Sequence, residues 1–226
     1  MGPEQIMAVR HGESEANLAH RRAGTTPLVY ERGDDEVTLT ELGRTQAAAL
    51  GRLLAALPAG EAPELVWCSP YLRALDTWRL ARERWGAAPP VTVDGRLRDQ
   101  EAGAFAHLNV AAIQERHPGE MARREREGAY AFRPPGGESL ADVVVRLRGF
   151  LADLSLDRRA DGRRVLIVAH DSVVLGLRHV IAAAPDAELA AVLEFAPVLN
   201  ASVSLWRAGG GRLDLVRFND VTHLTP

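Results

Sequence analysis

Cysteine is scarce in this sequence: Cys68 is the only one among 226 residues. A lone cysteine excludes an intramolecular disulfide and leaves a cysteine-based structural zinc site without its ligands. Long apolar runs are also missing, since none approaches the roughly 20 residues that span a bilayer. The first residues lack the basic, apolar and small-residue order of a signal peptide. We therefore expect a soluble, cytoplasmic protein that is neither secreted nor inserted in a membrane.

An excess of positive charge is absent as well. The formal net charge is -3 at pH 7, so nucleic acid is not an expected partner, and any bound anion must be held by a few locally placed arginines. Hydrophobic residues make up 46% of the chain and charged residues 25%. This balance is typical of globular proteins, and the length suits a single core. It leaves the oligomeric state open, a homodimer included.

Apolar patterns predict an α/β fold. Short apolar runs at Gln5 to Val9, Leu65 to Cys68 and Val165 to Ala169 are typical of buried strands. Between them, leucines from Leu42 to Leu57 and apolar residues from Val143 to Leu154 recur at helical spacing. Alternating strands and helices indicate a three-layer sandwich, in which helices flank a mainly parallel central sheet.

Local signals refine this arrangement. Ser69-Pro70 predicts the N-cap and first position of a helix that runs to about Trp85. Three glycines at 209–211 lie between two alternating runs and predict a hairpin turn. The polar segment from Gly103 to Glu138 predicts a lid-like insertion at about 103–138 within one domain that spans 1–226.

Chemically active side chains follow each of the three predicted strands. The first strand is followed by His11, the second by Ser69-Pro70 and Arg73, and the third by His170. Open α/β sheets bind their ligands at the carboxyl ends of the strands. We therefore expect His11, Arg73 and His170 to meet at one edge of the sheet.

This ordered set of motifs resembles the histidine phosphatase superfamily, also called phosphoglycerate mutase-like. The similarity spans nearly the whole chain and implies the fold of that family. It is carried by Arg-His-Gly-Glu-Ser at 10–14 with Asn17, Leu-Thr-Glu-Leu-Gly at 39–43, Ser-Pro at 69–70 with Arg73 and Thr77, Pro-Gly-Gly-Glu-Ser at 135–139, and the strand that ends at His170.

The resemblance implies a catalytic role for each matching residue. His11 would attack phosphorus, while Arg10, Arg73 and His170 would hold the phosphoryl oxygens; Asn17 and Arg21 would lie near the substrate. Physical chemistry agrees, because a nucleophilic histidine must be neutral and nearby arginines lower its pKa. The same cations neutralise charge on the equatorial oxygens during transfer. No metal and no cofactor is implied.

The general acid departs from the family pattern. Relatives place a glutamate four residues before a glycine, and here Asp99 stands at that distance from Gly103. Asp99 is one methylene shorter, and in an extended segment Glu101 would point to the same side. We therefore predict Asp99 as the acid and keep Glu101 as the alternative.

A second departure is Asp171, where relatives usually have glycine. We expect it to cap a helix that starts near Ser172, because aspartate satisfies free amides there.

The resemblance favours a phosphatase that hydrolyses a small phosphomonoester through a phosphohistidine. Phosphoglycerate mutases carry an arginine where this chain has Gln100, and a serine or threonine where it has Ala23. They also have a long arginine-rich insertion, which the segment from Gly103 to Glu138 does not match. A mutase-type phosphotransferase and a phosphate-binding pseudo-enzyme remain alternatives. A metallohydrolase is disfavoured, because no paired histidine-rich or aspartate-rich motif is present; its ligands would be His11, Asp99, Glu101 and His170.

Overall fold

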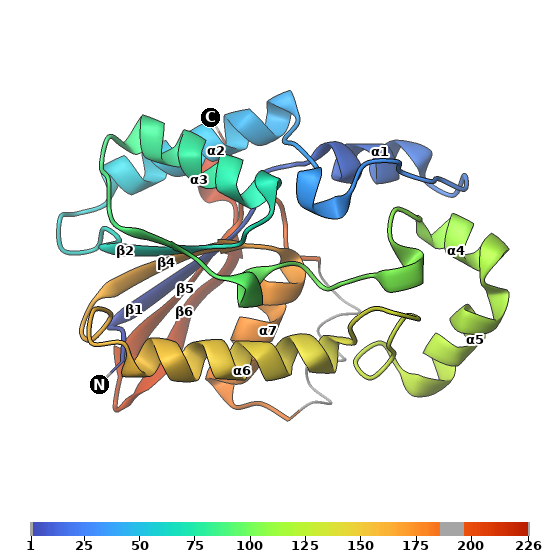
Figure 1. Ribbon diagram of the computed structural model, residues 1–226. Coiled ribbons are helices and arrows are strands. Elements are labelled where there is room, and N and C mark those ends of the chain that lie inside the picture. Colours follow the sequence, from blue (N-terminus) through green and yellow to red (C-terminus); the bar gives the residue numbers. More distant parts are fainter. Residues whose placement is uncertain (1, 186–196, 226) are drawn as a thin grey trace.

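Six strands form one sheet in the order β3-β2-β4-β1-β5-β6 within residues 2–185 and 197–225, the part of the chain that the computed structural model describes (Figure 1). Their bounds are β1 (Gln5–Arg10), β2 (Leu65–Cys68), β3 (Val91–Val93), β4 (Arg164–Ala169), β5 (Val203–Gly209) and β6 (Arg212–Asp220).

Strands β1 to β4 all run in one direction. β4 pairs in parallel with β1 and β2, and β2 pairs in parallel with β3, whereas β5 is antiparallel to both β1 and β6. The predicted mainly parallel sheet is therefore confirmed. The three predicted strands are β1, β2 and β4, and the three glycines at 209–211 join β5 to β6 as the predicted hairpin.

The described helices cover both faces of the sheet and one of its ends. In Figure 1, α2 and α3 lie over one face and α6 and α7 over the other, while α1, α4 and α5 lie beyond one end of the sheet. Their bounds are α1 (Glu15–Ala23), α2 (Glu41–Ala56), α3 (Leu72–Trp85), α4 (Val110–Arg116), α5 (Pro118–Glu127), α6 (Leu140–Leu156) and α7 (Asp171–Ala182).

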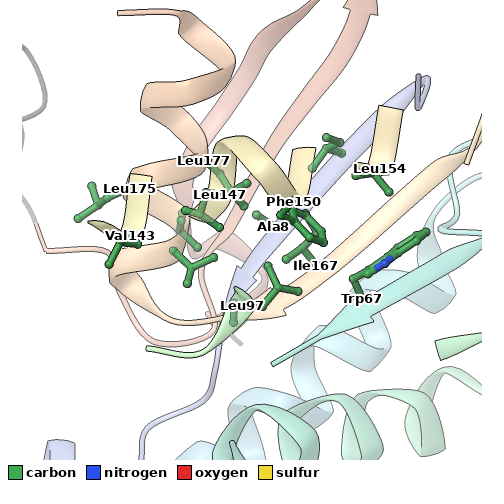
Figure 2. Packing of buried hydrophobic residues seen from close by; sticks show 14 of the residues in the cluster. Ala8, Trp67, Leu97, Val143, Leu147, Phe150, Leu154, Ile167, Leu175 and Leu177 are labelled. Carbon is green, nitrogen blue, oxygen red and sulfur yellow. The ribbon is translucent and has the colours of Figure 1, made fainter. Parts of the chain in front are cut away.

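Side-chain alternation along β1 divides the core in two. Ile6 and Ala8 face α6 and α7, where they join a cluster that includes Phe150 (Figure 2). Met7 and Val9 face α2 and α3, in a second cluster that holds the fully buried Cys68. Residues that alternate along a strand point to opposite faces, so the predicted three-layer sandwich is confirmed.

Two details of the helices differ from the sequence prediction. Leu42 was expected on the buried face of α2 but is 49% exposed. The buried stripe runs through Gly43, Ala47, Leu50 and Leu54, and Leu42 precedes it by one residue, about 100° around the helix. The predicted cap at Ser69-Pro70 is also wrong, because α3 starts at Leu72 with Tyr71 as a cap that lacks a side-chain bond.

Ser139 is the N-cap of α6. Ser139 accepts a hydrogen bond from the backbone of Asp142, and the Asp142 carboxylate accepts from the backbone of Ser139, so the two form a capping box at the start of α6.

The segment 103–138, which the sequence predicts to be a lid-like insertion, contains α4 and α5, and its two ends are joined by backbone hydrogen bonds. Glu138 donates its N–H to the carbonyl of Glu101 over 2.8 Å, and Ala104 donates to Pro135 over 2.8 Å. A side chain on Gly137 would come within 2.4 Å of the Glu101 carbonyl, so the two chain segments pass each other in direct backbone contact. Among the described helices, none is both long and apolar enough to cross a membrane.

Candidate active site

Three neighbouring strands, β2, β4 and β1, deliver the predicted side chains to one edge of the sheet. His11 follows β1, His170 follows β4, and Arg73 is the second residue of α3, which comes after β2. The rings of His11 and His170 lie 5.2 Å apart in an edge-on arrangement. The expectation that these residues meet is therefore confirmed.

The His11 imidazole is buried and its orientation is fixed from both sides. Nδ1 lies 2.7 Å from the carbonyl of Gly12, and Arg73 donates its Nε hydrogen to Nε2 over 3.2 Å. An atom that accepts from Arg73 carries no hydrogen, so the proton of the neutral ring is on Nδ1. The lone pair of Nε2 is thus the one that faces Arg73.

The loop after β1 is held by a close approach of two backbones. A side chain on Gly12 would come within 2.5 Å of the Gly43 carbonyl, and one on Gly43 would come within 2.0 Å of the Glu13 carbonyl. Only glycine fits at such a contact. Thr77 adds a bond by accepting the Gly12 N–H over 3.0 Å, so the loop that bears His11 is fixed to α2 and α3.

Burial and positive neighbours keep His11 neutral. Burial is the main cause that lowers its pKa well below the ordinary value of 6.5, and Arg73, His170 and Arg10 lower it further. A neutral imidazole retains a lone pair that can attack an electrophile.

Arg73 uses every donor nitrogen of its guanidinium. Besides the bond from Nε to His11, Nη2 donates to Asp99 Oδ2 over 3.0 Å and to Asp34 Oδ2 over 3.3 Å. Nη1 lies 3.0 Å from Asp34 Oδ1 and also donates to the Asp34 main-chain carbonyl. The Arg73 guanidinium lies 5.0 Å from the Tyr71 ring, in the range of a cation–π contact.

His170 is positioned by residues that the sequence analysis assigned differently or missed. Its Nε2 lies 2.8 Å from the hydroxyl of Ser69, which explains why Ser69 does not cap α3. The Tyr71 ring packs edge-on against it at 5.1 Å. Burial lowers the pKa of His170 to about 3, so its ring is neutral at pH 7.

Of the two candidate acids, the structure brings Asp99 into the cluster. Ser172 donates its hydroxyl to Asp99 Oδ1 over 2.7 Å, and Asp99 Oδ2 lies 3.4 Å from His170 Nδ1. Glu101 lines the same pocket, but its carboxylate accepts a 2.8 Å bond from Arg98. Gln100, which lies between Asp99 and Glu101 in the sequence, donates a hydrogen bond from its side-chain amide to the Glu138 carbonyl over 2.7 Å.

The Asp99 carboxylate is ionised in this arrangement. Burial acts to raise its pKa, but His170 and Arg73 outweigh burial and hold the pKa below its ordinary value. Because His170 is neutral at pH 7, Arg73 is the lasting source of positive charge beside Asp99.

Asp171 is the first residue of α7, and His170 is the N-cap. The predicted capping position is therefore wrong by one residue, although backbone N–H groups of Asp171 and Ser172 do favour its ionised form. Burial nevertheless raises the pKa of Asp171. Its side chain lines the pocket, where Arg10 is a nearby opposite charge.

Two buried nitrogens of the predicted site residues form no hydrogen bond within the described residues. They are Nε of Arg10, which lines the pocket, and Nδ1 of His170, which lies 3.4 Å from Asp99 Oδ2 and belongs to a ring edge-on to that of His11. A buried unpaired donor costs about 1–3 kcal/mol, so such atoms mark a place for an acceptor. The other end of Arg10 is anchored, since Nη1 donates to the carbonyl of Val198.

Asn17 and Arg21 line the outer part of the pocket, on α1. The Asn17 side-chain oxygen accepts from the Ser14 backbone over 3.1 Å and from Asn200 over 3.1 Å. Arg21 forms an ion pair with Glu13. Both predicted residues thus lie beside the cluster without bonding to His11.

The pocket has a volume of about 1090 Å³ and is lined by every predicted site residue except His170, whose ring packs against those of the lining residues His11 and Tyr71. Asp34 is the main functional neighbour that the sequence analysis missed; its only signal was the acidic stretch at 34–36. In the described ranges 2–185 and 197–225, no group of three or more histidine, cysteine, aspartate or glutamate side chains is placed to hold a metal ion.

The model of the histidine phosphatase superfamily (branch 1) matches residues 6–221. The chain is 31% identical over 217 residues to glucosyl-3-phosphoglycerate phosphatase of Mycobacterium tuberculosis, covering 93% of this chain and 82% of that protein. It is 33% identical over 170 residues to 2,3-bisphosphoglycerate-dependent phosphoglycerate mutase 2 of Gloeobacter violaceus, covering 75% of this chain and 71% of the mutase.

A solved structure of mycobacterial glucosyl-3-phosphoglycerate phosphatase in complex with VO3 shares the fold. Its TM-score is 0.77 at 29% identity, and the match covers 96% of this chain and all of that one. The chain belongs to the histidine phosphatase superfamily, branch 1. It is a phosphomonoester hydrolase of the histidine phosphatase type.

Proposed function

We propose that this enzyme hydrolyses a small phosphomonoester through a phosphohistidine on Nε2 of His11. The observation that carries the proposal is the pair of buried donors in Arg10 and His170 that form no hydrogen bond and belong to residues near His11. A phosphoryl group supplies the acceptor oxygens that these donors lack. Arg73 completes the set, because its guanidinium already touches His11.

His170 is suited to donate from Nδ1. The Ser69 hydroxyl can give its proton to Nε2 of His170, which leaves the ring proton on Nδ1. Donors fixed before the reaction stabilise charge on the transferring group without reorganising. Asn17 and Arg21 would contact the outer oxygens or the alcohol.

The first step moves the phosphoryl group to His11. The Nε2 lone pair forms the bond to phosphorus, the ester P–O bond breaks, and the departing oxygen takes a proton from Asp99. In the second step water attacks phosphorus, its proton returns to Asp99, and the N–P bond breaks to release inorganic phosphate. His11 and Asp99 are thereby regenerated.

Asp99 must be protonated for the first step, although its present contacts with His170 and Arg73 keep it ionised. A bound phosphate dianion would claim Arg73, which now pairs with Asp99 over 3.0 Å. Loss of that partner and the arrival of a like charge both raise the pKa of Asp99. The substrate itself therefore prepares the acid.

Net hydrolysis is favoured over mutase chemistry by the contacts of Gln100. Its amide is committed to the backbone of Glu138, at the position where mutases carry a substrate-contacting arginine. A pocket without that donor, and with Ala23 in place of a hydroxyl residue, should bind a carboxylated triose phosphate poorly. We propose a cytoplasmic enzyme of one domain that works without a metal or other cofactor.

The test traps the intermediate. Purified protein is mixed with a panel of phosphomonoesters and quenched in alkali, which preserves a phosphoramidate that acid destroys. We expect mass spectrometry to place the phosphoryl group on His11, and expect none in His11→Ala, while His117→Asn, altered outside the pocket, stays labelled. A label on aspartate, serine or cysteine would refute the mechanism.

A second assay separates the alternatives. A phosphatase releases inorganic phosphate and does not interconvert 2- and 3-phosphoglycerate. Efficient isomerisation that needs a bisphosphoglycerate primer would make the enzyme a mutase. Phosphate binding without turnover of even an aryl phosphate would make it a pseudo-enzyme.

A further inference from the structure

In the proposed phosphate site, a carboxylate of the chain itself, that of Asp34, binds the terminal nitrogens of Arg73. Asp34 lies on a short 3₁₀ turn (Asp34–Glu36) between α1 and α2. Its two carboxylate oxygens lie 3.0 and 3.3 Å from the two terminal nitrogens of Arg73. Arginine binds carboxylate and phosphate with the same two-pronged geometry, so Asp34 takes the place that phosphoryl oxygens need.

Of the two carboxylates on Arg73, Asp34 is the one able to leave. Asp99 is held by the Ser172 hydroxyl and by the Gln100 N–H over 2.8 Å, and its side chain is only 22% exposed. The Asp34 side chain is 49% exposed. Within the described residues its carboxylate has no hydrogen-bond partner other than Arg73, which is 4% exposed.

The segment that carries Asp34 is tied to the insertion. Asn109, at the start of α4, accepts the Leu28 N–H over 2.9 Å and donates to the Thr26 carbonyl over 2.8 Å. Tyr30 donates its N–H to the carbonyl of His107. The turn at Asp34 therefore lies between two anchored stretches, because residues 26–30 are bonded to the start of α4, and Thr38 and Thr40 form backbone hydrogen bonds with Glu15 and Glu13.

We propose that Asp34 is an internal competitor for the phosphoryl group, which a substrate must displace from Arg73. This inference rests on the proposed function, because it assumes that phosphate binds at Arg73. It makes Asp34 a specificity-determining residue: a ligand gains the site only if its anion binds Arg73 better than the tethered carboxylate does. A doubly charged phosphoryl group meets that condition more readily than a singly charged anion.

Removing the competitor should strengthen phosphate binding. The apparent affinity of a ligand falls with the fraction of protein in which the site is blocked. The test measures the Kd of inorganic phosphate by calorimetry for the wild-type protein, Asp34→Asn and Asp35→Asn. We expect Asp34→Asn to bind phosphate about threefold to tenfold more tightly, because a partly exposed ion pair stabilises the blocked state only modestly.

Asp35→Asn is the matched control. It removes the same charge from the next residue, and Asp35 is not among the groups that bond Arg73. We expect less than a twofold change. Equal affinities in Asp34→Asn and wild type, or equal gains in both variants, would overturn the inference, since charge alone would then explain the effect.

The binding assay separates this inference from the function it rests on. Arg73→Gln should lose phosphate binding. If phosphate binding is lost in Arg73→Gln but is unchanged in Asp34→Asn, the proposed competition by Asp34 is wrong, and the phosphate site at Arg73 is still supported. If no variant binds phosphate, the site itself is wrong, and the inference falls with it. Asp34→Ala is a second variant that also removes the carboxylate. The same gain in phosphate affinity in Asp34→Ala, together with thermal unfolding like that of the wild-type protein, would exclude a folding defect as the cause.

Discussion

Arg73 and His11 are in direct contact through a single hydrogen bond, from Nε of the arginine to Nε2 of the histidine over 3.2 Å. The cation therefore touches the proposed nucleophilic atom itself. This contact keeps a proton away from Nε2. We expect the Arg73 guanidinium to bind phosphoryl oxygens instead once a substrate is bound.

Arg73→Gln should slow the enzyme and move its pH dependence. Arg73 lowers the pKa of His11, so its loss raises that pKa, and His11 becomes protonated and inactive at a higher pH than in the wild type. The acid limb of kcat/KM should shift upward, and kcat/KM should fall about 10²–10³-fold, as when a charge-stabilising donor is lost. Arg79→Gln, on the exposed side of α3, should change neither quantity.

Asp99→Asn should be selective for the leaving group. An alkyl alkoxide needs a proton when it departs, whereas nitrophenolate does not, so alkyl phosphates should lose far more activity than nitrophenyl phosphate. Glu101→Gln is the matched control, because that carboxylate pairs with Arg98. Equal losses on both substrates would remove Asp99 from the role of acid, and a selective loss in Glu101→Gln would transfer it.

Activity should survive a chelator. Arg10, Arg73 and His170 supply the donors that a divalent ion provides in other phosphatases. Prolonged treatment with EDTA, followed by gel filtration, should leave kcat unchanged, and added Mg²⁺ or Zn²⁺ should not raise it. Activity that disappears and returns with the ion would contradict the prediction.

Acid should destabilise the fold through the buried histidines. The folded pKa of His170 is about 3 and that of an unfolded histidine is 6.5, so between these values the unfolded chain binds the extra proton. The free energy of unfolding therefore falls as pH drops below 6.5, by up to about 1.4 kcal/mol per pH unit for each such histidine. Urea titrations at pH 7.0 and 5.5 measure the slope, which should be shallower in His170→Asn.

The sequence was sufficient to predict three parallel strands, the hairpin and the cluster at the sheet edge, but it did not predict β3 (Val91–Val93) or the strand order. Buried parallel strands are continuous apolar runs, so Gln5 to Val9 and Val165 to Ala169 were readable without any contact map. Residues that follow neighbouring parallel strands must meet, which fixed His11, Arg73 and His170 in one place. Whether they act as proposed is for the variants above to decide.

Side-chain partners across long sequence distances were not readable. Ser69 has the sequence signature of a helix cap, but His170, 101 residues away, takes its hydroxyl instead. Asp34 lies in an acidic loop whose composition is typical of solvated surface, and only the folded chain shows its carboxylate on Arg73. In both cases a tertiary partner overrides the local preference.

Cys68 offers a practical route to watching the insertion. Its thiol is fully buried on β2, and burial raises its pKa to about 12, so it forms almost no thiolate at neutral pH and resists alkylation. Because the chain has no other cysteine, a thiol introduced by Val110→Cys, at a 61% exposed position on α4, would be the sole target of a maleimide probe. A fluorophore there could report movement of α4 when phosphate enters, in an otherwise unaltered enzyme.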